Sequence, residues 1–98
     1  MNVTKKIENS VLTVWLDGKL DTNTTPLAEP IIMEDVDKVN QVIIDMEHLK
    51  YISSAGLRLL LVLHKKMASR DGLILIHIND TIMEILNFTG FSHVLTIQ

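Results

Sequence analysis

The clearest capacity for chemistry in this chain lies in the segment Tyr51-Ile52-Ser53-Ser54-Ala55-Gly56-Leu57. The segment joins an apolar, β-branched run to a stretch with helical spacing, so its serines lie at a predicted helix N-terminus. Unpaired backbone N–H groups at such an end favour a hydroxyl acceptor or an added phosphate. Ser53 or Ser54 can therefore cap the helix, or carry a modification or touch a ligand. A nucleophilic serine is the third interpretation, but of the Gly-x-Ser-x-Gly elbow only Gly56 is present.

The other reactive side chains are scattered along the sequence. The four histidines have no His-x-x-x-His or His-Glu-x-x-His spacing, so we expect no metal site; they are His48, His64, His77 and His93. The absence of cysteine excludes disulfides and thiolate chemistry. The isolated glycines form no phosphate cradle. Without a base, a ligand set or a cofactor motif, we predict that the chain is not an enzyme and needs no cofactor.

Two aspartates are weaker candidates. Asp45 ends an apolar strand, where a carboxylate often faces the crevice above a parallel sheet. We favour the alternative that Asp45 caps a neighbouring loop. Asp21 follows Gly18-Lys19-Leu20 and is interpreted first as a turn stabiliser and second as a neighbour of the serine site.

The amino-terminal half predicts two strands and one helix. Val3–Ile7 and Val11–Asp17 are predicted strands, with a hairpin turn between them and a turn signal at Asp17-Gly18. A helix follows that begins either at Thr25-Pro26 or at Pro30, since proline fits a first helical turn better than an interior. Its predicted apolar stripe is Leu27, Ile31, Met33, Val36 and Val39.

The carboxyl-terminal half alternates strands and helices. Val42–Met46 and Leu73–Ile78 are typical of buried strands. The helix between them ends at about Arg70, with Leu57, Leu60, Leu61, His64, Met67 and Ala68 on one face. A last helix, capped by Asn79 or Asp80 and carrying Ile82, Ile85 and Leu86, ends near Gly90 before a closing strand at Val94–Ile97. This order predicts an α/β sandwich with a mixed, largely parallel sheet and helices mainly on one face.

Composition narrows the class of protein. With 98 residues and 47% apolar side chains, we expect residues 1–98 to form a single domain with one core. A net charge of −3 argues against direct nucleic-acid binding. The longest apolar run, Leu59–Leu63, is far short of a membrane span, and the first residues lack a signal-peptide core. We therefore expect a cytoplasmic protein without membrane insertion.

Charge is uneven along the chain. Residues 54–70 hold four bases and no acid: Arg58, Lys65, Lys66 and Arg70. Residues 17–38 hold six acids against Lys19 and Lys38. Solvated faces are the first interpretation, and complementary patches that steer a protein partner are the alternative.

The sequence resembles the STAS domain, the fold shared by anti-sigma factor antagonists and the cytoplasmic tails of sulfate transporters. The likeness is carried by three segments: Leu16-Asp17-Gly18-Lys19-Leu20-Asp21, Val42-Ile43-Ile44-Asp45-Met46, and Leu49-Lys50-Tyr51-Ile52-Ser53-Ser54-Ala55-Gly56-Leu57. Asn87-Phe88-Thr89-Gly90-Phe91 fits the turn after the family's last major helix. The resemblance covers the whole chain and implies a STAS-like sandwich.

The resemblance implies partner switching. In bacterial members the unphosphorylated domain binds an anti-sigma factor that is also a serine kinase. Phosphorylation separates the two, and a metal-dependent serine phosphatase restores binding. The phospho-acceptor maps onto Ser54. Around it we expect partner contacts from Asp21, Ser53, Ala55, Gly56, Leu57 and Arg58, in a protein that is a monomer or weak dimer.

The chain departs from the family pattern at two positions. The usual pattern is Asp-Ser-Ser/Thr-Gly-Leu, so Ser53 stands where the aspartate often is, and Ala55 replaces the second hydroxyl. The lost aspartate favours an alternative role as a phosphate-independent STAS subunit of a membrane transporter ATPase complex. A nucleotide-binding role is a weaker third interpretation, because no phosphate loop is present.

Overall fold

The computed structural model describes all of residues 1–98 and alternates strands with helices. The elements in chain order are β1 (Asn2–Glu8), β2 (Val11–Leu20), α1 (Thr25–Val36), β3 (Gln41–Asp45), β4 (Leu49–Ile52), α2 (Ser54–Met67), β5 (Gly72–Ile76), α3 (Asp80–Thr89), the short 3-10 helix η1 (Phe91–His93) and β6 (Thr96–Ile97). The predicted α/β class is confirmed.

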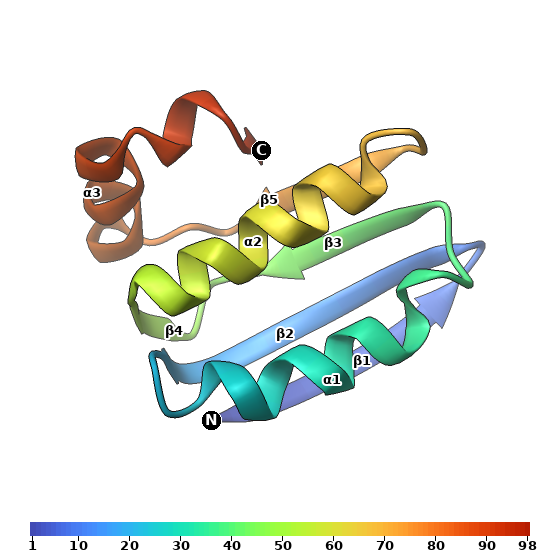
Figure 1. Cartoon of the computed structure of the whole chain (residues 1–98), viewed down its shortest axis with the longest axis horizontal. Coiled ribbons are helices and arrows are strands. Elements are labelled where there is room, and N and C mark those ends of the chain that lie inside the picture. Colours follow the sequence, from blue (N-terminus) through green and yellow to red (C-terminus); the bar gives the residue numbers. More distant parts are fainter.

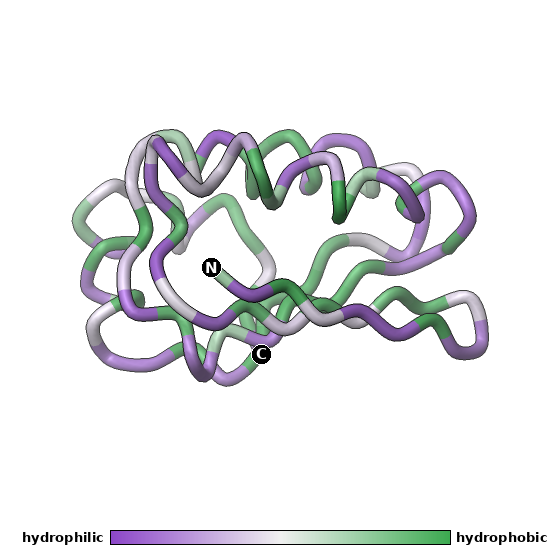
Figure 2. Tube along the Cα trace, turned by 90° about the horizontal axis from the view of Figure 1, so that it is seen from below, coloured by the Kyte–Doolittle hydropathy of each residue, from purple (hydrophilic) through white to green (hydrophobic).

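The six strands form one mixed sheet in the order β1-β2-β3-β5-β6, with β4 paired to the far end of β2. Only β1 and β2 run antiparallel, and every other pair is parallel. Helices α1 and α2 lie side by side over one face of this sheet (Figure 1). Figure 2, which views the molecule edge-on, shows both helices on the same side of the strands. The largely parallel sheet with helices mainly on one face is therefore as predicted.

The core lies between the sheet and these two helices. Strand alternation sends Leu12, Val14 and Leu16 into it, where each is at most 1% exposed. Twenty-three buried apolar residues form one continuous cluster. On the opposite face of β2, Trp15 keeps 36% of its surface exposed, because no helix covers that side.

The predicted turn at Asp17-Gly18 is wrong. Strand β2 continues to Leu20, and Gly18 instead forms an irregularity in the strand, with φ of +118°. A glycine accepts this backbone conformation without a Cβ clash. Beyond the irregularity β2 pairs with β4, a strand that the sequence did not predict because Leu49–Ile52 has no period-2 pattern. This pairing places Leu49–Ile52, the segment that precedes the two serines, beside the end of β2.

Helix α1 begins at Thr25, and Pro30 lies inside it. The predicted apolar stripe is partly wrong. The buried face of α1 is Thr25, Ala28, Ile32 and Val36, whereas Leu27 is 66% and Ile31 39% exposed. A spacing of four residues from Ala28 follows the helical period better than the stripe drawn from the larger side chains.

The later elements agree with prediction in type and differ at their ends. Helix α2 stops at Met67, and its Leu61 and His64 are only half-buried while Ala68 is exposed. Strand β5 ends at Ile76, since His77 adopts φ of +55°. Asn79 caps α3 by accepting the N–H of Ile82 at 3.0 Å, and Gly90 ends α3 at φ of +81°, both as expected. The closing strand is short because Val94 and Leu95 continue the turn of η1, donating their N–H groups to the Phe91 carbonyl at 3.0 and 2.9 Å.

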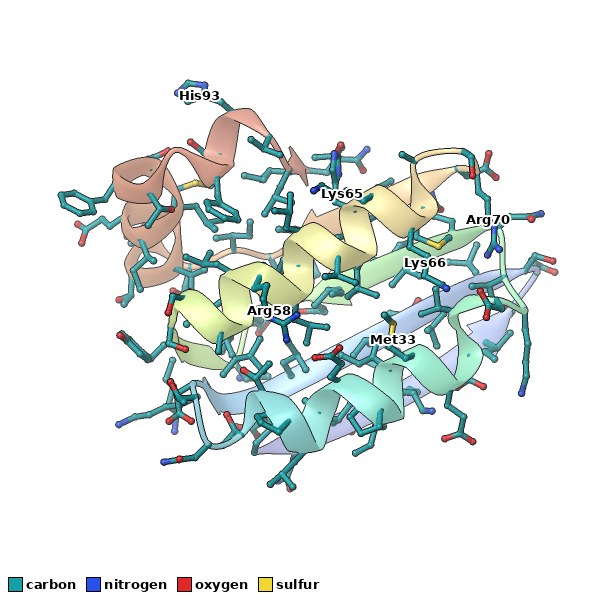
Figure 3. The ribbon with its side chains drawn as sticks, in the orientation of Figure 1. Met33, Arg58, Lys65, Lys66, Arg70 and His93 are labelled. Carbon is teal, nitrogen blue, oxygen red and sulfur yellow. The ribbon has the colours of Figure 1, made fainter.

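The acidic and basic runs meet between α1 and α2. Arg58 Nη2 lies 3.2 Å from Glu29 Oε1, and Lys66 Nζ lies 3.2 Å from Asp37 Oδ1. Arg70 donates to the carbonyls of Val36 and Val39 at 2.8 and 2.9 Å. Figure 3 shows Arg58, Lys66 and Arg70 extending toward α1, with Lys65 on another side of α2. Much of this charge pattern therefore joins the two helices of this chain.

Candidate functional site

The N-terminus of α2 carries the two serines in different environments. Ser53 is the residue before the helix, and its N–H donates to the Leu20 carbonyl at 2.9 Å. Its Oγ is buried without a hydrogen-bond partner and does not cap the helix. Ser54 is the first helical residue and is exposed. The first turn of α2 contains no acidic side chain. Side-chain capping by Ser53 is therefore absent, and the positive end of the helix dipole has no acidic neighbour in its own turn.

Gly56 sets how closely α2 approaches the sheet. A Cβ placed on Gly56 would lie 2.7 Å from Ile52 Cγ1 and 2.8 Å from the carbonyl oxygen of Leu20. Real Cβ atoms do not approach so closely, so any larger residue would push the helix away from β2 and β4. This glycine thus positions Ser54 relative to the end of β2.

Asp21 stabilises the turn between β2 and α1, as predicted. Its Oδ1 accepts the backbone N–H groups of Asn23 at 2.9 Å and Thr24 at 3.0 Å. The Thr24 hydroxyl donates to the Lys19 carbonyl at 2.6 Å, which closes the turn. The N–H donated by Thr24, followed by that of Asn23, lowers the pKa of Asp21 below its usual 3.8.

Asp21 is expected to make folding stability depend on acidic pH. Because the folded-state pKa is lowered, its contribution is fully present above the unfolded pKa and is lost as pH falls through the folded value. Between about pH 5 and pH 2 the wild-type urea midpoint should therefore fall further than that of Asp21→Asn. Asp71→Asn, at an exposed acid outside the turn, is the matched control. Equal pH slopes for wild type and Asp21→Asn would contradict this expectation.

Arg58 lies one helical turn beyond Ser54. Residues four apart share one side of a helix, so the Arg58 side chain lies on the same side of α2 as Ser54. The Arg58 side chain is 61% exposed, and its guanidinium is paired with Glu29 of α1. The amino-terminal halves of α1 and α2 are thereby joined at the end of the molecule that carries Ser54 (Figure 1).

The other residues predicted for this site differ in how far they are buried. Ala55 is half-buried, while Gly56 and Leu57 are buried, so these last two can act only by holding the surface in place. Tyr51 is 45% exposed and Ile52 is in the core, which the sequence did not distinguish. Leu27 of α1 lies on the surface and not in the predicted apolar stripe. The four-residue spacing from Ala28 is the sequence signal that identifies the buried face.

Asp45 is the last residue of β3. Its Oδ1 accepts the N–H of Glu47 at 3.0 Å, which confirms the loop-capping interpretation. Its Oδ2 lies 2.8 Å from His77 Nδ1.

Comparison with known proteins identifies the family. A model of the STAS domain matches residues 2–98. The chain belongs to the STAS domain family. A curated relative, the candidate anti-sigma factor antagonist BtrV of Bordetella bronchiseptica, is 30% identical over 93 residues, which are 93% of this chain and 80% of BtrV.

Solved structures confirm that this STAS domain has the anti-sigma factor antagonist fold. An anti-sigma factor antagonist from Mycobacterium paratuberculosis superposes with a TM-score of 0.88 at 21% identity, covering 98% of this chain and 83% of that one. The Bacillus cell fate determinant SpoIIAA in its phosphorylated form superposes with a TM-score of 0.73 at 19% identity, covering 99% and 91%. No helix of this STAS domain has the length and apolar character needed to cross a bilayer.

Proposed function

We propose that this chain acts as a single, cytoplasmic STAS domain that antagonises an anti-sigma factor, with phosphorylation of Ser54 as the switch. Unphosphorylated, it binds an anti-sigma factor that is also a serine kinase. Phosphorylated, it releases that partner, and a metal-dependent serine phosphatase resets it. The family match and the relatives support the class of function. The domain itself acts by binding and not as an enzyme.

The observation that carries the proposal is the exposure of Ser54 and its position at the start of α2. Its side chain is exposed at the first position of α2, a helix that lacks both a side-chain cap and an acid in its first turn. A kinase can therefore reach the hydroxyl. The N–H groups and dipole of the helix end can accommodate about −1.5 to −2 charges of added phosphate without unfolding the domain.

Arg58 gives the phosphate a second way to alter the surface. A phosphate on Ser54 would compete with the Glu29 carboxylate for the guanidinium one turn away, because phosphate accepts bidentate hydrogen bonds from arginine. Withdrawal of Arg58 from Glu29 would change the charge pattern across the ends of both helices. The switch then needs side-chain movement and no refolding.

Release of the partner follows from desolvation. A protein packed over phosphorylated Ser54 would have to bury a dianion and remove the water that hydrates it. One unpaired charge in a buried interface costs about 3–5 kcal/mol, enough to dissociate a complex of moderate affinity. The same phosphate that the free domain tolerates is therefore incompatible with the complex.

Ser53 supports a second candidate function, a phosphate-independent subunit of a membrane transporter ATPase complex. In this role the surface at α2 would bind the ATPase permanently. The Ser53 hydroxyl is buried and unpartnered where many family members carry an aspartate, so the acidic surroundings of the phospho-acceptor are missing.

Co-purification separates the two candidates. The chain, tagged at its carboxyl end, would be isolated from its own cells with a Ser54→Asp variant as the matched control. We expect a kinase-like anti-sigma factor with the wild type and its loss with Ser54→Asp. A membrane ATPase retained equally by both proteins would replace the proposal with the transporter function.

A further inference from the structure

Three side chains with metal-binding atoms meet at the carboxyl ends of the neighbouring strands β3 and β5. They are Asp45, Glu47 and His77, and one ligand atom from each lies within 4.8 Å of those of the other two. The closest pair is Asp45 Oδ2 and His77 Nδ1, at 2.8 Å. The group joins two carboxylates to an imidazole, a mixed oxygen and nitrogen set that divalent transition metals accept.

The fold brings these residues together from two parallel strands. Asp45 is the last residue of β3 and pairs in register with Ile76, the last residue of β5, so His77 follows immediately beside it. Glu47 lies in the turn after β3. The carboxyl ends of neighbouring parallel strands are where α/β sheets commonly bind ligands.

Burial distinguishes the three donors. Asp45 is only 8% exposed, and its other oxygen is fixed by the Glu47 N–H, so its carboxylate is held in one orientation. The side chains of Glu47 and His77 are both 59% exposed, which leaves the outer side of the group open to solvent. A neighbouring hollow of about 310 Å³, lined by Glu47, His48, Leu49, Lys50, Asn79 and Thr81, gives room for bound water beside it.

We propose that Asp45, Glu47 and His77 bind one divalent transition-metal ion of the Zn²⁺ type, with water at the remaining position. Atoms bound to one Zn²⁺ at about 2.0–2.2 Å lie about 3–4 Å apart, so a modest rotation of the exposed Glu47 side chain completes the set. The ion would take the place of the hydrogen bond between Asp45 and His77. Its two positive charges would balance the two carboxylates.

Trp15 provides a direct probe of this site. It is the only tryptophan in the chain and is the register partner of Asp45 on the neighbouring strand β2. Register partners share one face of a sheet, with strands about 4.8 Å apart. A paramagnetic ion such as Co²⁺ bound at Asp45 should therefore quench the fluorescence of Trp15, and diamagnetic Zn²⁺ should displace it and restore the signal.

The experiment is a titration of the purified full chain with Co²⁺, followed by Zn²⁺. We expect saturable quenching at one ion per chain with half-saturation below about 100 µM. His77→Asn should raise the half-saturating concentration at least about tenfold, as loss of metal-site residues commonly does. Asparagine is chosen because it tolerates the positive φ of His77.

Two further variants keep the test decisive. Glu47→Gln alters an exposed side chain, so it should weaken metal binding while leaving the far-UV circular dichroism unchanged. His93→Asn is the control, since His93 is exposed on η1, away from β2 and β3 (Figure 3). No saturable quenching up to about 1 mM, or equal titrations for wild type, His77→Asn and Glu47→Gln, would overturn the proposal. A loss caused equally by His93→Asn would also overturn it.

Discussion

Replacing Ser54 with aspartate is expected to weaken binding of the anti-sigma factor by about a hundredfold or more, whereas Ser54→Ala should bind like the wild type. Ser54 is exposed and is the first helical residue, not the capping one, so removal of its hydroxyl leaves α2 and the surrounding surface intact. A carboxylate at the same position introduces a charge that the bound partner would have to desolvate. Calorimetric titration of each purified variant with the anti-sigma factor measures the difference.

Ser69→Asp is the matched control for the added charge. Ser69 is exposed just beyond the other end of α2, a helix of 14 residues whose length is about 21 Å. If the effect depends on the position of the charge, Ser69→Asp should bind within about twofold of the wild type. Equal affinities for Ser54→Asp and Ser54→Ala would count decisively against the proposed switch.

Gly56→Ala is expected to lower the free energy of unfolding by about 2–3 kcal/mol. The new methyl group would meet the side chain of Ile52 and the backbone carbonyl of Leu20 at less than 3 Å. A rotamer change can move Ile52, but only a shift of the backbone can move the carbonyl. Urea denaturation monitored by circular dichroism measures the loss.

The sign of this change is diagnostic. At an exposed helical position, replacing glycine with alanine stabilises a protein by about 0.5–1 kcal/mol, because alanine is the better helix former. Ser69→Ala, on the exposed surface, should change stability by less than about 0.5 kcal/mol. An unchanged or raised urea midpoint for Gly56→Ala would show that α2 does not depend on close contact with the end of β2.

Much of the fold could be predicted because its strands and helices follow local rules. Val42–Met46 and the apolar run after Gly72 have the composition of strands buried on both faces. The end of β2 and the whole of β4 could not be predicted in this way. Their pairing has only three register partners and contains an irregularity between Gly18 and Lys19, where the sequence shows a turn signal.

The position of the site could be predicted from the small residues around Ser54, but its environment could not. Whether Ser53 caps the helix depends on where the folded chain places its hydroxyl, which is buried and makes no capping hydrogen bond. The pairing of Arg58 with Glu29 joins residues 29 positions apart on two helices. Likewise, Asp45 and His77 meet only because β3 and β5 are neighbours in the sheet, a relation that histidine spacing cannot reveal.

Phosphosite mapping tests the central claim most directly. The protein would be isolated from its own cells during growth and under stress, and its peptides would be analysed by mass spectrometry. We predict phosphate on Ser54, not on Ser53, in a fraction that changes with the condition. An unmodified Ser54 in every condition would contradict the phosphorylation switch.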